Sequence, residues 1–193
     1  MDQLTIYLKM GFDHISDWRG IDHIIFILVL CAVYTIQDCR KVAVLITAFT
    51  IGHSLTLALA AFKIFIANPL LIELLIPVTI FLTSLQNIYF RSLNTKENYL
   101  HYLFALLFGF IHGMGFSNFF NAMMSDSMSI ALPLFAFNLG LELGQLCIVF
   151  LFFGFYFLIK KLFNPDHWHW TLFISGAGAG MAILMFIERL AAN

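Results

Sequence analysis

Six long apolar segments make up most of the sequence and are separated by short polar connections. They cover residues of about 21–36, 42–67, 69–90, 99–124, 130–159 and 168–190. About 20 apolar residues cross the hydrocarbon core of a bilayer, and backbone in lipid must satisfy its own hydrogen bonds. The pattern therefore predicts an all-α polytopic bundle of about six transmembrane helices, in which short connections make neighbouring helices antiparallel.

The first twenty residues follow a different pattern. Their apolar positions recur at helical spacing, at Leu4, Tyr7, Leu8 and Phe12, and charged residues lie between them. The segment lacks the long apolar stretch and the small-residue cleavage site of a signal peptide. We therefore expect residues 1–20 to form an amphipathic interfacial helix, and residues 1–193 to form a single integral membrane domain.

Composition agrees with this interpretation. Of 193 residues, 61% are hydrophobic and only 11% are charged, whereas about a quarter of a soluble domain is charged. A net charge of −1 gives no indication of nucleic-acid binding. The 3 cysteines contain no CxxC pair, so neither a disulfide framework nor a zinc ribbon is indicated.

Charges in the connections predict the orientation. Basic residues follow the first, third and fifth segments: Arg40 and Lys41, Arg91 and Lys96, Lys160 and Lys161. The other two connections carry only Lys63 and the acidic Asp126. Because positively charged loops remain in the cytoplasm, we expect both termini on the outer side.

Several ionisable side chains lie within or beside these apolar segments, where each costs several kcal/mol unless it is paired, hydrated or bound. They are His14, Asp22, His23, His53, His112 and Glu142. The first three lie at the outer start of the first segment. At ~1.5 Å per residue, the last three lie near the middle of the bilayer. All six are therefore expected in one half of the bundle.

Imidazole and carboxylate groups together suit zinc, nickel, cobalt or iron. We predict one metal site whose core is His23, His53, His112 and Glu142. Outer or supporting ligands are His14 and Asp22, and groups that orient the ligands are Asn138, Gln145 and Ser54. For any one of these histidines, an ordinary hydrogen bond between helices is the alternative. No catalytic nucleophile is evident.

Small residues accompany these motifs. We expect five glycines to let helices approach closely enough for the polar side chains to meet: Gly52, Gly109, Gly113, Gly140 and Gly144. Gly176 and Gly180 form a further small-residue ridge, which predicts helix packing in the last segment.

Four motifs in the same order resemble the HupE/UreJ family of hydrogenase and urease accessory membrane proteins, in its second, shorter branch. They are GF-x-H…G-x-D-H from Gly11 to His23, GHSLTLALA from Gly52, FGFIHGMGF from Phe108 and FNLGLELGQ from Phe137. The resemblance implies a small polytopic protein that takes up nickel or cobalt for metalloenzyme maturation. We expect a bacterial inner membrane, in which the loop charges place both termini in the periplasm.

Three functions remain open from the sequence. A transporter would carry a divalent transition metal between periplasm and cytoplasm. An intramembrane metal-dependent hydrolase would use the same ligands to activate water against a lipid or peptide bond, with Glu142 as a possible base. A structural metal would only hold the helices together. The expected partners are the metal ion, membrane lipid and a metalloenzyme maturation system.

Overall fold

The structure is a computed structural model that describes residues 2–62, 64, 68–89, 99–123 and 130–192. Every regular element in these residues is helical, which confirms the all-α prediction. The α-helices are α1 Gln3–Ser16, α2 Ile21–Cys31, α3 Cys39–Ala61, α4 Pro69–Tyr89, α5 Tyr99–Met123, α6 Ala131–Phe163 and α7 His167–Ala191. Short 3₁₀ helices, Trp18–Gly20 and Ile36–Asp38, precede α2 and α3.

Four helical stretches are long and apolar enough to cross a membrane: Ile36–Ala61, Pro69–Tyr89, Ala131–Phe163 and His167–Ala191. Two shorter apolar helices, Ile21–Cys31 and His101–Ser117, lie among them. The 11 residues of α2 extend over only about 16 Å, roughly half the hydrocarbon thickness. Length and composition thus describe an integral membrane protein in which α2 is an internal half-length helix.

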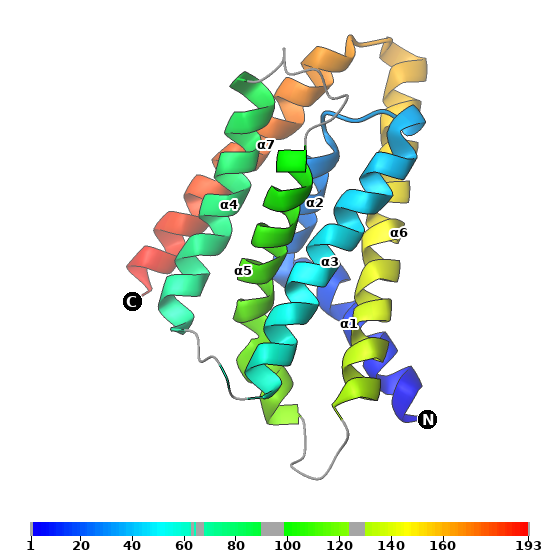
Figure 1. The fold of residues 1–193 in the computed structure, drawn as a ribbon. Coiled ribbons are helices and arrows are strands. Elements are labelled where there is room, and N and C mark those ends of the chain that lie inside the picture. The colour runs from blue at the N-terminus through cyan, green and yellow to red at the C-terminus, as the bar shows by residue number, and fades with distance from the viewer. Residues whose placement is uncertain (1, 63, 65–67, 90–98, 124–129, 193) are drawn as a thin grey trace.

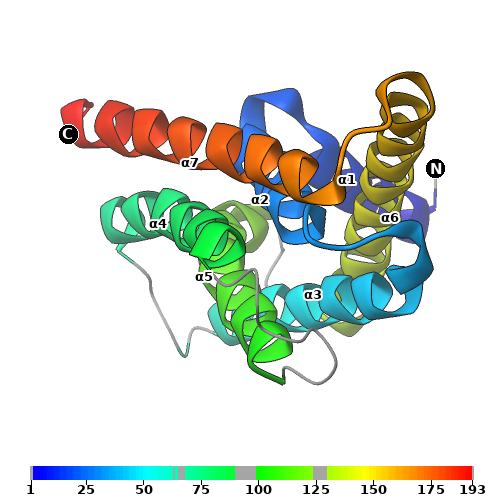
Figure 2. The ribbon, with the colours of Figure 1, turned by 90° about the horizontal axis from the view of Figure 1, so that it is seen from above.

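From α2 to α7 the helices alternate in direction along one bundle (Figure 1). The start of α1 and the end of α7 lie at the lower end in this view, and the starts of α3 and α7 lie at the upper end. Seen from above, α2 lies inside the group formed by α3 to α7 (Figure 2). Its central place agrees with its burial, since its histidine and most of its apolar side chains are buried.

Some sequence expectations fall outside the described residues. These are the charges at Lys63, Arg91, Lys96 and Asp126, and the segment ends at residues 67, 90 and 124.

Two pairs of helices pack with their backbones in contact. An added Cβ at Gly52 would overlap the carbonyl oxygen of Leu106, and one at Gly109 would overlap that of Phe49, so α3 and α5 touch along this line. In the same way, Gly11 of α1 lies against the Phe137 carbonyl of α6. Gly113, Gly140 and Gly144 are equally crowded. All five glycines of the sequence prediction therefore serve close helix approach.

The glycines Gly176 and Gly180 of the last segment do not lie on the face of α7 that packs against the bundle. A Cβ at Gly176 or Gly180 would meet none of the described residues within 4 Å, whereas one at Gly178 would overlap the Val29 side chain. The prediction that Gly176 and Gly180 pack against another helix of the chain is wrong, because the buried face of α7 is rotated to present Gly178.

The N-terminal helix is present as expected and lies along α6. Its buried residues are Tyr7, Gly11 and Ile15, spaced four apart on one face. Ile15 is fully buried and lies against Gly144, where an added Cβ would overlap its side chain. This packing holds the last turn of α1, which carries His14, against the interior of the bundle.

Candidate metal centre

Three imidazoles from three helices converge in the half of the bundle where α1 ends. His14 lies in the last turn of α1, His23 in the first turn of α2, and His53 in the second half of α3. One ligand atom from each lies within 4.8 Å of the others. His23 and His53 are buried and His14 is partly buried.

His112 of α5 lies beside this group. Its ring centre is 5.0 Å from that of His23, and the rings are nearly perpendicular, at 78°. His112 is 1% exposed, so it shares the dry environment of the other rings. Four helices therefore deliver imidazoles to one place.

Most nitrogens of these rings have no hydrogen-bond partner in the described part of the chain. They are His14 Nε2, His23 Nε2, both nitrogens of His53, and His112 Nδ1, and all are buried. Burying a polar atom without a partner costs on the order of 1–3 kcal/mol. A metal ion bound by imidazole lone pairs would remove that cost, so these residues fit a transition metal.

An ion pair orients the His23 ring. Asp22 accepts a hydrogen bond from His23 Nδ1 at 2.9 Å, and its second oxygen accepts one from Arg189 at 2.8 Å. Arg189 also donates to the backbone carbonyl of Glu73 at 2.7 Å. Because an ionised carboxylate only accepts hydrogen bonds, Nδ1 carries the proton and Nε2 keeps its lone pair. Asp22 thus orients the His23 ring, and its role as a metal ligand stays a prediction.

Thr79 of α4 orients His112 in a similar way. The Thr79 hydroxyl donates its only proton to the Ile76 carbonyl at 2.7 Å, and it lies 3.2 Å from His112 Nε2. Thr79 must therefore accept from Nε2–H, which leaves the lone pair on His112 Nδ1. This is the nitrogen that has no partner.

Aromatic rings enclose the histidines. The Phe116 ring lies 4.0 Å from that of His14, and Phe137 stacks on His53 at 6.2 Å and 19°. Phe26 and Phe49 lie within 5.4 Å of His112, measured between ring centres. Such walls exclude water and lower the local dielectric constant, which strengthens any charge interaction inside them.

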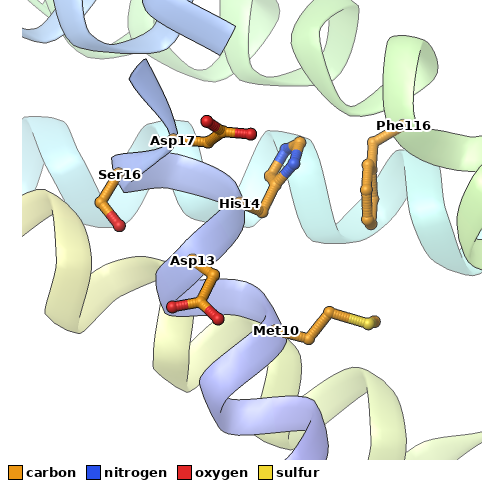
Figure 3. A pocket seen from close by; sticks show the side chains of 6 residues that line it. All are labelled: Met10, Asp13, His14, Ser16, Asp17 and Phe116. Atoms are coloured by element: carbon orange, nitrogen blue, oxygen red, sulfur yellow. The ribbon is translucent and has the colours of Figure 1, made fainter. Parts of the chain in front are cut away.

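A cavity of about 480 Å³ reaches His14 from the surface (Figure 3). Its lining residues are Met10, Asp13, His14, Ser16, Asp17 and Phe116. Asp13 and Asp17 are exposed, and Figure 3 shows the Asp17 carboxylate directed to the side on which the His14 ring lies. A cation can therefore approach the imidazoles past two carboxylates.

Glu142 lies at the contact between α3 and α6. It accepts a hydrogen bond from the Thr47 hydroxyl at 2.7 Å. The group of converging ligand atoms found in the described residues consists of histidines and does not include Glu142. The ligand role of Glu142 therefore stays a prediction.

The three side chains expected to orient the ligands form hydrogen bonds with groups other than imidazoles. Gln145 accepts from Thr50 at 2.8 Å, Ser54 donates to the Thr50 carbonyl at 2.6 Å, and Asn138 donates to the Leu134 carbonyl at 2.8 Å. Asn138 Oδ1 and Gln145 Nε2 are buried and have no partner in the described residues.

The groups that do contact the imidazoles are Thr79 and Asp22, and Asp22 is in turn bound by Arg189. Thr79 and Arg189 were not expected from the sequence. Arg189 looks like an ordinary interfacial residue at a helix end, and a threonine in an apolar helix carries no signal.

The family comparison agrees with this site. The family model described as HupE / UreJ protein matches residues 1–189, essentially the whole chain. The chain belongs to the HupE/UreJ family. No curated protein and no solved structure matches it significantly. HupE/UreJ membership implies an accessory or transport role for nickel or cobalt in the maturation of hydrogenase or urease, and the histidine group is compatible with that role.

Proposed function

We propose that the protein transports a divalent transition metal of the nickel or cobalt type across the bacterial inner membrane. The ion binds His14, His23 and His53, with His112 as a further ligand beside them. One observation carries the proposal: imidazole atoms from three helices lie within 4.8 Å of one another, and buried nitrogens of each of these rings have no hydrogen-bond partner among the described residues.

The donor set defines the class of metal. Imidazole nitrogens suit nickel, cobalt, zinc and copper, whereas magnesium and calcium prefer oxygen ligands. Because zinc binds such ligands as readily as nickel does, zinc is an expected occupant of purified protein. Selection among these metals then depends on which ion is available and which is released.

The cavity beside His14 supports access from the side of the termini, which we assign to the periplasm. Asp13 and Asp17 give its mouth a negative charge, which raises the local concentration of cations. The basic residues at the opposite end of the bundle, such as Lys160 and Lys161, agree with a cytoplasmic position for that end.

Metal uptake by proteoliposomes tests the proposal. We expect nickel or cobalt uptake by the intact protein and its loss, by at least about tenfold, in His23→Ala and in His53→Ala. His169→Ala is the matched control, because His169 is an exposed histidine in the first turn of α7 at the other end of the bundle. Uptake that survives both site substitutions would contradict the proposal.

A second function is favoured by the same cavity. Three histidines beside a cavity of about 480 Å³ could hold zinc as in catalytic zinc sites, which have three protein ligands and leave the fourth position to water or substrate. There the metal would activate water against a lipid or peptide bond. Stoichiometric tightly bound zinc, no metal flux and hydrolysis of such a bond would favour this enzyme over a transporter.

A further inference from the structure

A second cavity lies at the other end of the bundle from the imidazoles, between the end of α6 and the connection from α2 to α3. Its volume is about 510 Å³. The residues that matter for its chemistry are Ile36, Phe153, Tyr156, Phe157, Lys160 and Lys161. It shares no lining residue with the cavity beside His14, so it requires its own explanation.

The floor of this cavity is rigid and apolar. Tyr156 and Phe153 are buried, and the Tyr156 hydroxyl lies 3.2 Å from His167 Nδ1. His167 Nε2 lies 3.2 Å from the carbonyl of Val33, which can only accept, so Nε2 donates and Nδ1 accepts from Tyr156. One imidazole thereby ties the end of α2, α6 and the start of α7 together beneath the cavity.

The rim of the cavity combines exposed apolar and cationic side chains. Phe157 is 68% exposed and Ile36 is 66% exposed. Lys160 and Lys161 are exposed as well, and neither forms an ion pair within the described residues. The neighbouring Lys41, by contrast, pairs with Asp38 at 3.0 Å. The two lysines of α6 are therefore available to an anion from outside the chain.

The depth of the cavity in the membrane follows from the length of α6. Its 33 residues extend about 50 Å, which exceeds a hydrocarbon core of about 30 Å. Lys160 and Lys161 lie in its last turn, at the level where Trp168 begins α7. Tryptophans at a helix end are typical of the membrane–water interface. The cavity thus lies where lipid headgroups meet acyl chains.

We propose that this cavity binds one anionic phospholipid. The phosphate lies between Lys160 and Lys161, and an acyl chain lies along Phe153, Phe157 and Ile36. Basic pockets at the ends of transmembrane helices are known to bind the phosphate of anionic lipid headgroups. A soluble anion would use the lysines but leave the apolar wall exposed, so the combination favours a lipid. The proposal is independent of metal transport.

Binding of phosphatidylglycerol to the detergent-purified protein, measured by native mass spectrometry, tests this site. We expect phosphatidylglycerol to bind more tightly than phosphatidylcholine with the same acyl chains. Lys160→Gln with Lys161→Gln should weaken phosphatidylglycerol binding about 25-fold, since each lysine near an anionic lipid contributes about fivefold. Lys160→Arg with Lys161→Arg should restore it, because the charge is kept.

Arg40→Gln is the matched control, because Arg40 is exposed at the same end of the bundle and does not line the cavity. Its phosphatidylglycerol affinity should stay within twofold of the intact protein. An equal loss in Arg40→Gln would indicate general electrostatic attraction and overturn the site. Equal binding of the two lipids, or equally tight binding of glycerol phosphate, would overturn the lipid as its occupant.

Discussion

Proton positions on two imidazoles are set by neighbouring side chains from other positions of the bundle. Asp22 holds the proton on His23 Nδ1 and Thr79 accepts the one on His112 Nε2, so each ring keeps one nitrogen lone pair without a partner. Arg189 contacts the other oxygen of Asp22, across 167 positions of sequence. A change at Arg189 should therefore reach the metal through Asp22.

We expect Asp22→Asn to weaken cobalt binding about 10- to 100-fold, which is typical for loss of a group that orients a ligating histidine. Arg189→Gln should weaken it less, and should add little in the Asp22→Asn background because both act on His23. Cobalt affinity is measured by competition with a chromophoric chelator. Asp38→Asn, a carboxylate at the other end, is the control, and strictly additive losses would show that Arg189 acts separately.

At the scale of the elements, glycines decide how closely the helices that carry the histidines approach. Backbone contact at Gly52 and Gly109 joins α3 to α5, and contact at Gly11 joins α1 to α6. These pairs bring His53, His112 and His14 within reach of α2. A side chain at one of these glycines could not be accommodated by a small shift of its neighbours, because the atoms that it would overlap belong to the backbone of the facing helix.

Gly109→Ala should destabilise the protein by at least about 1–3 kcal/mol, because its Cβ overlaps the Phe49 backbone. Gly176→Ala should leave stability equal or raise it by up to ~1 kcal/mol, since alanine favours helix and the site is open. Thermal unfolding of the detergent-purified protein measures both. Equal melting temperatures for the two variants would contradict the packing of α3 on α5.

For the whole molecule, the candidate metal site joins helices that are distant in sequence. Its histidines come from α1, α2, α3 and α5, whereas Asp22 connects α2 to α7 through Arg189. A ligand that binds only the folded state raises its stability according to the ratio of ligand concentration to Kd. Metal binding should therefore stabilise the entire bundle.

We expect nickel at 100 times its Kd to stabilise the folded protein by about 2.7 kcal/mol, and a chelator to remove that gain. The melting temperature with and without nickel measures this. His53→Ala should lose the response, while His169→Ala should keep it. A nickel-induced increase that persists in His53→Ala would place the metal elsewhere.

Orientation is also a property of the whole chain. In a background with Cys31, Cys39 and Cys147 replaced by serine, Lys161→Cys should be labelled by an impermeant reagent only from the cytoplasmic side. Gln3→Cys should be labelled only from the periplasmic side. The opposite pattern would reverse the topology that the basic connections predict.

Much of this architecture is readable from the chain itself. Apolar length predicts membrane helices because lipid leaves the backbone no other partner, and polar groups inside them stand out because burying them is costly. His14, His23, His53 and His112 could thus be selected as a cluster before any contact was known. The glycines of α3, α5 and α6 could be selected with them, since small residues are what close helix packing requires.

The tertiary structure decided what depends on how each helix is rotated about its axis. Rotation turns Gly178 rather than Gly176 toward α2, sets Glu142 against Thr47, and brings Thr79 and Arg189 to His112 and Asp22. A hydrogen bond requires placement to within a few tenths of an ångström, and this is fixed by packing across the whole bundle. The sequence by itself therefore determined which residue types enter the membrane and that imidazoles gather there. Only the fold decided which atoms of those residues face one another.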